Sequence, residues 1–89
     1  MKLIFIHAAW CGPCKTMVPI IEKLKDHIEI LDFDVDIPDN DVLISKYHVR
    51  NIPVFVLEDS IGTVLWKHVG TIKENELIDK LKEYEAYKE

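Results

Sequence analysis

The sequence predicts an α/β fold in which three helices flank a four-stranded mixed sheet, in the order β-α-β-α-β-β-α. Short apolar runs, which are typical of strands, occur at residues 2–7, 29–34, 54–57 and 64–69. Apolar residues spaced three and four apart, which are typical of helices that cover a sheet, separate or follow these runs. The chain of 89 residues contains no repeats, linkers or low-complexity segments, so we predict a single domain over residues 1–89.

The first half of the chain predicts a strand, a helix and a second strand. Residues 2–7 are apolar on both faces, as expected for a central strand that helices cover. Residues 11 to about 27 form the helix, and its apolar positions are Cys14, Met17, Val18, Ile21, Leu24 and Ile28. Pro19 removes a backbone N–H inside this helix and predicts a kink. Residues 29–34 form the next strand, so we expect a parallel pair joined by a right-handed crossover.

A short second helix and a link precede the third strand. Residues 38–40 open this helix, which runs to about Tyr47 and has Leu43 and Tyr47 on its inner face. The link contains His48 and Asn51. After glycine, these residue types are among those that best tolerate a left-handed backbone.

The C-terminal part predicts a hairpin and a final helix. Residues 54–57 and 64–69 are the strands, and residues 58–63, which include a glycine, are expected to form the hairpin loop. The last helix runs to about residue 84 and has two alternative starts, a capping box of Thr71 and Glu74 or a cap about two residues later. The apolar stripe of this helix is predicted to be core, and it consists of Leu77, Ile78, Leu81 and Tyr84.

Charge and hydropathy argue against several function classes. The chain has 11 Lys and Arg against 16 Asp and Glu, and its formal net charge of −5 argues against nucleic acid or an anionic membrane as the main partner. The apolar run that begins at Leu3 is too short for a signal peptide, and no stretch approaches the ~18 apolar residues of a membrane span. The acidic residues between positions 32 and 41 lack the glycine and closing glutamate of a calcium loop. We predict a cytoplasmic protein.

The two cysteines, Cys11 and Cys14, stand between the first predicted strand and the first helix. Cys11 lies near the helix N-terminus, where free N–H groups carry partial positive charge and stabilise a thiolate. Pro13 suits the first helical turn, and Gly12 allows the backbone to turn tightly beside the sulfur. Cys14 lies one turn later on the same face, within disulfide reach. The pair is therefore predicted to alternate between dithiol and disulfide.

Two other roles for this cysteine pair have less support. A structural disulfide here would close a very short loop and would constrain little of the unfolded chain. A zinc ion would need two more ligands, or a site shared between two chains. No paired spacing exists among the histidines, which are His7, His27, His48 and His68. We predict no bound metal.

The residues around the cysteines resemble the active-site signature of the thioredoxin family. The matching stretch follows a strand and reads Ala8-Ala9-Trp10-Cys11-Gly12-Pro13-Cys14-Lys15. The thioredoxin loop that carries a cis-proline is similar to Val49-Arg50-Asn51-Ile52-Pro53. The resemblance covers nearly the whole chain and implies a short form of the thioredoxin-like fold. Compared with a full thioredoxin the first strand and helix are missing, as in small microbial or phage thioredoxins.

The resemblance implies a thiol–disulfide oxidoreductase that reduces protein disulfides, with Cys11 as the attacking thiol and Cys14 as the resolving thiol. It implies a cis bond before Pro53. It also implies a substrate-binding surface of Trp10, Gly12, Pro13, Ile52, Pro53 and Gly70. No cofactor is expected, because a thioredoxin reductase-like enzyme would reduce the redox-active disulfide during electron transport for cell redox homeostasis. We expect a monomer that acts on protein disulfides and binds neither nucleic acid nor membrane.

Thioredoxins usually carry a buried aspartate six residues before the first cysteine, with a lysine partner on the neighbouring strand. This sequence has Phe5 and Asp32 at the matching positions, and phenylalanine cannot transfer a proton. One hypothesis is that Asp32 points to solvent and water takes the proton of the resolving thiol. The other is that Asp32 lies partly buried beneath Cys14 and acts as the base, and His7 is a weaker candidate for that role.

Two alternative functions follow from the same residues. A glutaredoxin-like enzyme would use glutathione as the reductant. The chain length favours this reading, but the Trp-Cys-Gly-Pro-Cys stretch and the lack of a cationic cluster for the glutathione carboxylates argue against it. A thioredoxin-fold subunit could also bind a partner without catalysis. Such a subunit would tolerate Cys11→Ser, whereas an enzyme would not.

Overall fold

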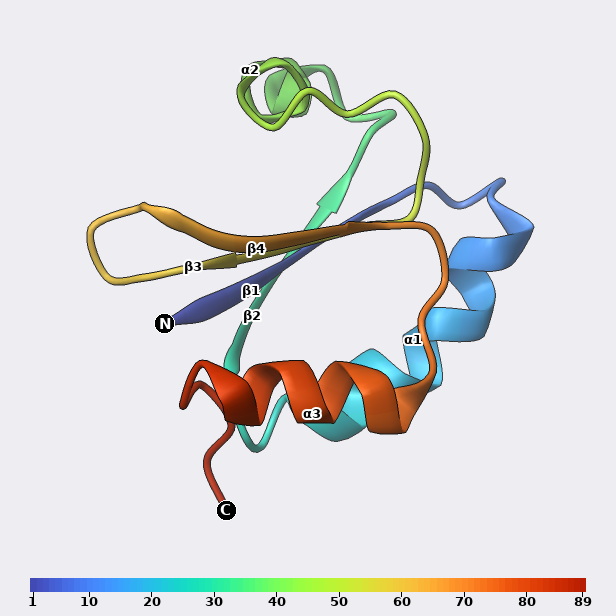
Figure 1. Cartoon of the computed structure of the whole chain (residues 1–89). Helices are drawn as coiled ribbons and strands as arrows, with labels where there is room; N and C mark the ends of the chain where they lie inside the picture. Colours follow the sequence, from blue (N-terminus) through green and yellow to red (C-terminus); the bar gives the residue numbers. More distant parts are fainter.

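The four strands join into one mixed sheet in the order β2-β1-β3-β4, in a computed structural model that describes all 89 residues (Figure 1). β1 (Lys2–His7) pairs in parallel with β2 (Glu29–Asp34) and antiparallel with β3 (Val54–Glu58), and β3 pairs antiparallel with β4 (Val64–Val69). The helices are α1 (Gly12–Leu24), the 3-10 helix η1 (Pro38–Asn40), α2 (Asp41–Lys46) and α3 (Glu74–Glu83). The predicted fold class and element order are confirmed.

Helices cover both faces of the sheet, with α2 on one side and α1 and α3 on the other (Figure 1). Because successive side chains of a strand point to opposite faces, β1 contributes to two cores. Leu3 and Phe5 join the core under α1 and α3, and Ile4 and Ile6 join the core under α2. The central strand therefore has no exposed face, as its apolar sequence predicts.

The first helix is shorter than predicted. Cys11 is its N-cap, and the last helical residue is Leu24 rather than one near His27. The N–H groups of His27 and Ile28 both donate to the Leu24 carbonyl, at 2.9 and 3.1 Å, and so close the helix with a turn. The helix continues through Pro19.

The inward face of α1 matches the predicted stripe except at one position. Val18 is 42% exposed, so its predicted burial is wrong. A helix advances by about 100° per residue. Val18 is therefore turned well away from Met17, past the edge of the face that packs on the sheet. The buried positions are Cys14, Met17, Ile21 and Leu24, and Ile28 is buried just beyond the helix.

The predicted short second helix consists of η1 followed by α2, and Tyr47 is the C-cap of α2. Leu43 and Tyr47 pack toward the sheet, as predicted. Of the two residues suited to a left-handed backbone, His48 adopts that conformation, with φ 53°, and Asn51 does not. The chain therefore reverses directly after α2 and runs toward β3.

Two predictions for the C-terminal half are wrong. Glu58 belongs to β3 and is 2% exposed, whereas the sequence pattern places it in the hairpin loop. The turn begins at Asp59, whose Oδ1 accepts the N–H groups of Ile61 and Thr63 at 3.0 and 2.8 Å. The capping box of Thr71 and Glu74 is also wrong: the N-cap of α3 is Lys73, which agrees with the alternative start about two residues later.

The apolar stripe of α3 is core, as predicted. Leu77 and Leu81 are fully buried, and Ile78 and Tyr84 pack against them at the margin of the same cluster. None of the helices combines the length and apolar content needed to cross a lipid bilayer.

Candidate active site

The two cysteines lie where β1 has ended and α1 begins. They form a disulfide with their Cα atoms 5.2 Å apart. The Sγ of Cys11 also accepts the backbone N–H of Cys14 at 3.2 Å, so a sulfur atom serves as the N-cap of the helix. Free N–H groups at a helix N-terminus carry partial positive charge and stabilise a thiolate at this position. The sequence predicted this arrangement.

A cleft of about 320 Å³ lies beside Cys11. Trp10, at 67% exposed, forms one wall, and Gly12 and Pro13 continue it. The opposite wall comes from the chain before β3 and consists of Arg50, Asn51 and Ile52. The cleft is therefore built from two segments that are about forty residues apart in the sequence.

The backbone at Ile52 and Pro53 is close to the disulfide. The bond between these residues is cis, as predicted, and the Ile52 carbonyl oxygen lies 3.9 Å from Cys11 Sγ. The Pro53 carbonyl accepts the N–H of Gly70 at 2.8 Å. Gly70 has φ +98°, a conformation that side chains disfavour, and the space where its Cβ would stand is open. Four of the six residues predicted for the substrate-binding surface therefore line the cleft, and the other two, Pro53 and Gly70, connect to it through Ile52.

Sequence reasoning did not include Arg50 and Asn51 among the site residues. Both are exposed and line the cleft. Their position next to Ile52 in the loop before the cis-proline is the signal that points to them.

The two proton-transfer candidates contact each other. His7 Nε2 pairs with Asp32 Oδ1 across β1 and β2, and the His7 ring stacks on Phe5. The Asp32 side chain is 49% exposed, which agrees with the hypothesis that it points to solvent and contradicts the alternative of partial burial beneath Cys14. The reason is that β2 is an edge strand. Three apolar side chains pack with the cysteines, and they are Ala8, Val35 and Ile52.

No group of three or more His, Cys, Asp or Glu side chains has the arrangement of a metal site. The two cysteines are bonded to each other.

The family model named Thioredoxin matches residues 1–83. The chain belongs to the thioredoxin family. It is 39% identical over 77 residues to a mouse mitochondrial thioredoxin. The match covers 84% of this chain and 46% of that protein. It is 33% identical over 81 residues to the thioredoxin of Mycoplasmoides gallisepticum, covering 90% of this chain and 80% of that protein. The chain thus spans about half the length of the mammalian relatives it matches.

Solved thioredoxin structures superpose on the chain closely. A thioredoxin variant from Halobacterium salinarum NRC-1 gives a TM-score of 0.82 at 34% identity, over 93% of this chain and 73% of that one. Oxidised mitochondrial thioredoxin 3 from Saccharomyces cerevisiae gives a TM-score of 0.77 at 29% identity. The match covers 92% of this chain and 76% of that one. The predicted family and the predicted thioredoxin-like fold are confirmed.

Proposed function

We propose that the protein is a thiol–disulfide oxidoreductase that reduces protein disulfides. The observation that carries this proposal is the Cys11–Cys14 disulfide at the N-terminus of α1, with the Ile52 carbonyl 3.9 Å from the Cys11 sulfur. Membership of the thioredoxin family supports the same reaction class. Residues 1–89 act in this proposal as a single domain.

In the reaction, the Cys11 thiolate attacks one sulfur of a substrate disulfide. A bond forms between Cys11 and that sulfur, and the second substrate sulfur leaves as a thiolate that takes up a proton. Cys14 then loses its proton and attacks the Cys11 sulfur, which restores the Cys11–Cys14 disulfide and releases the first substrate sulfur. Two electrons pass to the substrate, and an external reductant must restore the dithiol. The helix N-terminus stabilises the Cys11 thiolate between cycles.

The substrate docks in the cleft beside Cys11. An extended segment can pair with the backbone N–H and C=O of Ile52 in the manner of an added strand. Trp10 supplies an exposed aromatic wall, and Gly70 leaves open space next to the Pro53 carbonyl. We assign substrate contact to these residues and to Gly12 and Pro13.

Water takes the proton of Cys14 in this scheme. The Asp32 side chain is half exposed and already paired with His7, so Asp32 is not buried beneath Cys14 as a base. The His7–Asp32 pair is the alternative acceptor.

The partners in this proposal are a thioredoxin reductase-like enzyme and proteins that carry disulfides, and the protein acts as a monomer in the cytoplasm. A reducing compartment maintains the dithiol that the reaction needs. Bacterial, mitochondrial and chloroplastic thioredoxins are all among the similar proteins.

The experiment that tests the function is insulin reduction driven either by NADPH with a thioredoxin reductase or by glutathione. We expect turnover with the first system, complete loss in Cys11→Ser, and a trapped mixed disulfide on Cys11 in Cys14→Ser. Alkylation of the reduced parent protein should label Cys11 before Cys14. Turnover with glutathione alone would favour the glutaredoxin-like alternative, and retained partner binding by an inactive parent would favour a binding subunit.

A further inference from the structure

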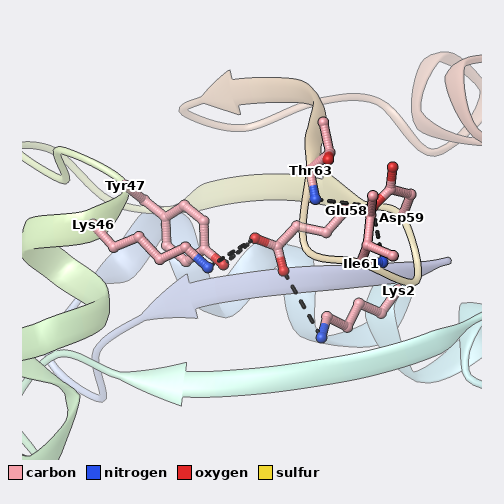
Figure 2. A network of polar contacts seen from close by, with 7 residues as sticks. All are labelled: Lys2, Lys46, Tyr47, Glu58, Asp59, Ile61 and Thr63. Atoms are coloured by element: carbon pink, nitrogen blue, oxygen red, sulfur yellow. Dashed lines mark hydrogen bonds and ion pairs between the residues drawn. The ribbon is translucent and has the colours of Figure 1, made fainter.

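A buried carboxylate lies at the end of β3 that is remote from the cysteines. Glu58 is 2% exposed and is the only charged residue in the buried interior. Its Oε1 lies 3.9 Å from Lys2 Nζ, and its Oε2 lies 3.4 Å from Lys46 Nζ and accepts a hydrogen bond from the Tyr47 hydroxyl (Figure 2). We refer to these four residues as the Glu58 cluster. Because a buried charge must be paired to be tolerated, the cluster holds β1, β3 and the end of α2 together.

Tyr47 is fixed at both of its ends. Its hydroxyl donates to Glu58 on β3, and its backbone carbonyl accepts a hydrogen bond from Lys67 Nζ on β4 at 2.6 Å. Its ring is 5% exposed and packs in the core cluster that contains Ile4 and Val56. This residue is therefore the principal attachment of α2 to the sheet.

The helix α2 has few other attachments. It is six residues long, and none of those residues is buried. A helix this short is not stable by itself in water, so its position depends on tertiary contacts. Leu43 packs against the same core as Tyr47 but is only partly buried.

The loop that faces the cysteines directly follows Tyr47. Residues 48–52, which we name the docking loop, run from the left-handed residue His48 to Ile52, whose carbonyl lies 3.9 Å from Cys11 Sγ. Pro53 holds one end of this loop through its hydrogen bond with Gly70. Tyr47 holds the other end, and Arg50 between them is exposed.

We propose that the Glu58 cluster positions the docking loop and thereby sets the affinity of the cleft for disulfide-bearing protein segments. Pro53 directly precedes β3 and Glu58 ends it, so the two residues are five positions apart along extended chain, which is roughly 16 Å. Glu58 therefore touches no substrate and is a positioning residue. A protein segment must pair with the loop backbone, whereas a small disulfide needs only to reach the Cys11 sulfur. The inference rests on the proposed function, because it concerns the substrate surface of the same site.

The test compares Tyr47→Phe and Glu58→Gln with the parent protein, using insulin and a small aromatic disulfide as the two substrates. We expect KM for insulin to rise about fivefold in each variant, while kcat and the rate with the small disulfide change less than about twofold. Tyr84→Phe is the matched control. It removes a hydroxyl from the C-cap of another helix, α3, where Tyr84 makes no side-chain hydrogen bond, and it should leave KM unchanged.

Loss of folding stability without a change in KM would show that the cluster is merely structural and would overturn the inference. If Tyr47→Phe and Glu58→Gln do not fold, the inference is tested with Lys67→Met instead. It removes the second attachment of Tyr47 from an exposed position and should raise KM for insulin in the same way. An unchanged KM in that variant would also overturn the inference. A parent protein that reduces neither disulfide would instead refute the proposed function, and this inference with it.

Discussion

Cys11 and Cys14 are three residues apart but have different surroundings. Both are buried, at 5% and 1% exposed, but Cys11 caps the helix and lines the cleft, whereas Cys14 lies within the first turn and does not line it. In the proposed reaction, Cys11 is therefore the attacking thiol and Cys14 the resolving thiol. In the proposed reaction the proton on Cys14 leaves during the second step, and His7 and Asp32, on β1 and β2, are the two residues predicted as possible acceptors.

We predict that replacing the His7–Asp32 pair leaves proton transfer unchanged. Asp32→Asn and His7→Gln should each release a trapped mixed disulfide with the parent's pH profile and within about twofold of its rate, because water accepts the proton. The measurement is the release rate across the pH range. The control is Asp26→Asn, at an exposed position just beyond α1.

A shift of the release profile in both variants, with none in the control, would assign the proton to the His7–Asp32 pair. A shift in only His7→Gln would leave histidine as the acceptor and Asp32 as its partner.

At the scale of one element, α1 shows how one helix serves both the site and the core. Its first turn holds the disulfide, and its later turns carry the side chains that fix the helix on the sheet. Ile21 is 2% exposed, while Val18, three positions earlier, is 42% exposed.

Ile21→Ala should therefore lower the free energy of unfolding by about 2–5 kcal/mol, because it leaves a cavity against the sheet. Val18→Ala is the control on the same helix and should lower the free energy of unfolding by less than about 1 kcal/mol. Urea denaturation of the oxidised proteins measures both changes. Equal costs at the two positions would contradict the packing of α1 described above.

At the scale of the whole molecule, the Glu58 cluster joins the two halves of the chain. Burial raises the pKa of the Tyr47 hydroxyl above its ordinary value of 10.0, and the hydrogen bond and negative charge of Glu58 raise this pKa further. The folded protein therefore keeps this proton at a pH where the unfolded chain has lost it. The contribution of Tyr47 is present in full below pH 10 and declines as the pH rises above it.

We predict that the free energy of unfolding of the parent falls more steeply above pH 10 than that of Tyr47→Phe. The difference between the two slopes should approach about 1.4 kcal/mol per pH unit, which corresponds to one proton released on unfolding. Urea midpoints measured from pH 9 to pH 11 give both slopes, and parallel slopes would exclude Tyr47 as the group responsible.

The sequence by itself determined the elements and the position of the cysteines. Short apolar runs located the strands, and apolar residues spaced three and four apart located the helices, because this spacing places side chains on one helix face. The cysteine spacing placed both sulfurs in one helical turn, and the stretch before Pro53 indicated the second wall of the cleft. These features depend on neighbours along the chain.

Only the tertiary structure decided which distant residues meet. In the sequence, Glu58 follows the apolar run 54–57 and precedes a turn, so the local pattern places its side chain in solvent. In the structure, two lysines and a tyrosine from two other elements pair with the buried carboxylate and make its burial tolerable. Asp32 is exposed because β2 lies at the sheet edge, which strand order alone determines. Arg50 joins the cleft because the chain before β3 passes beside α1. Each outcome depends on packing between segments far apart in the chain, and local spacing carries no information about it.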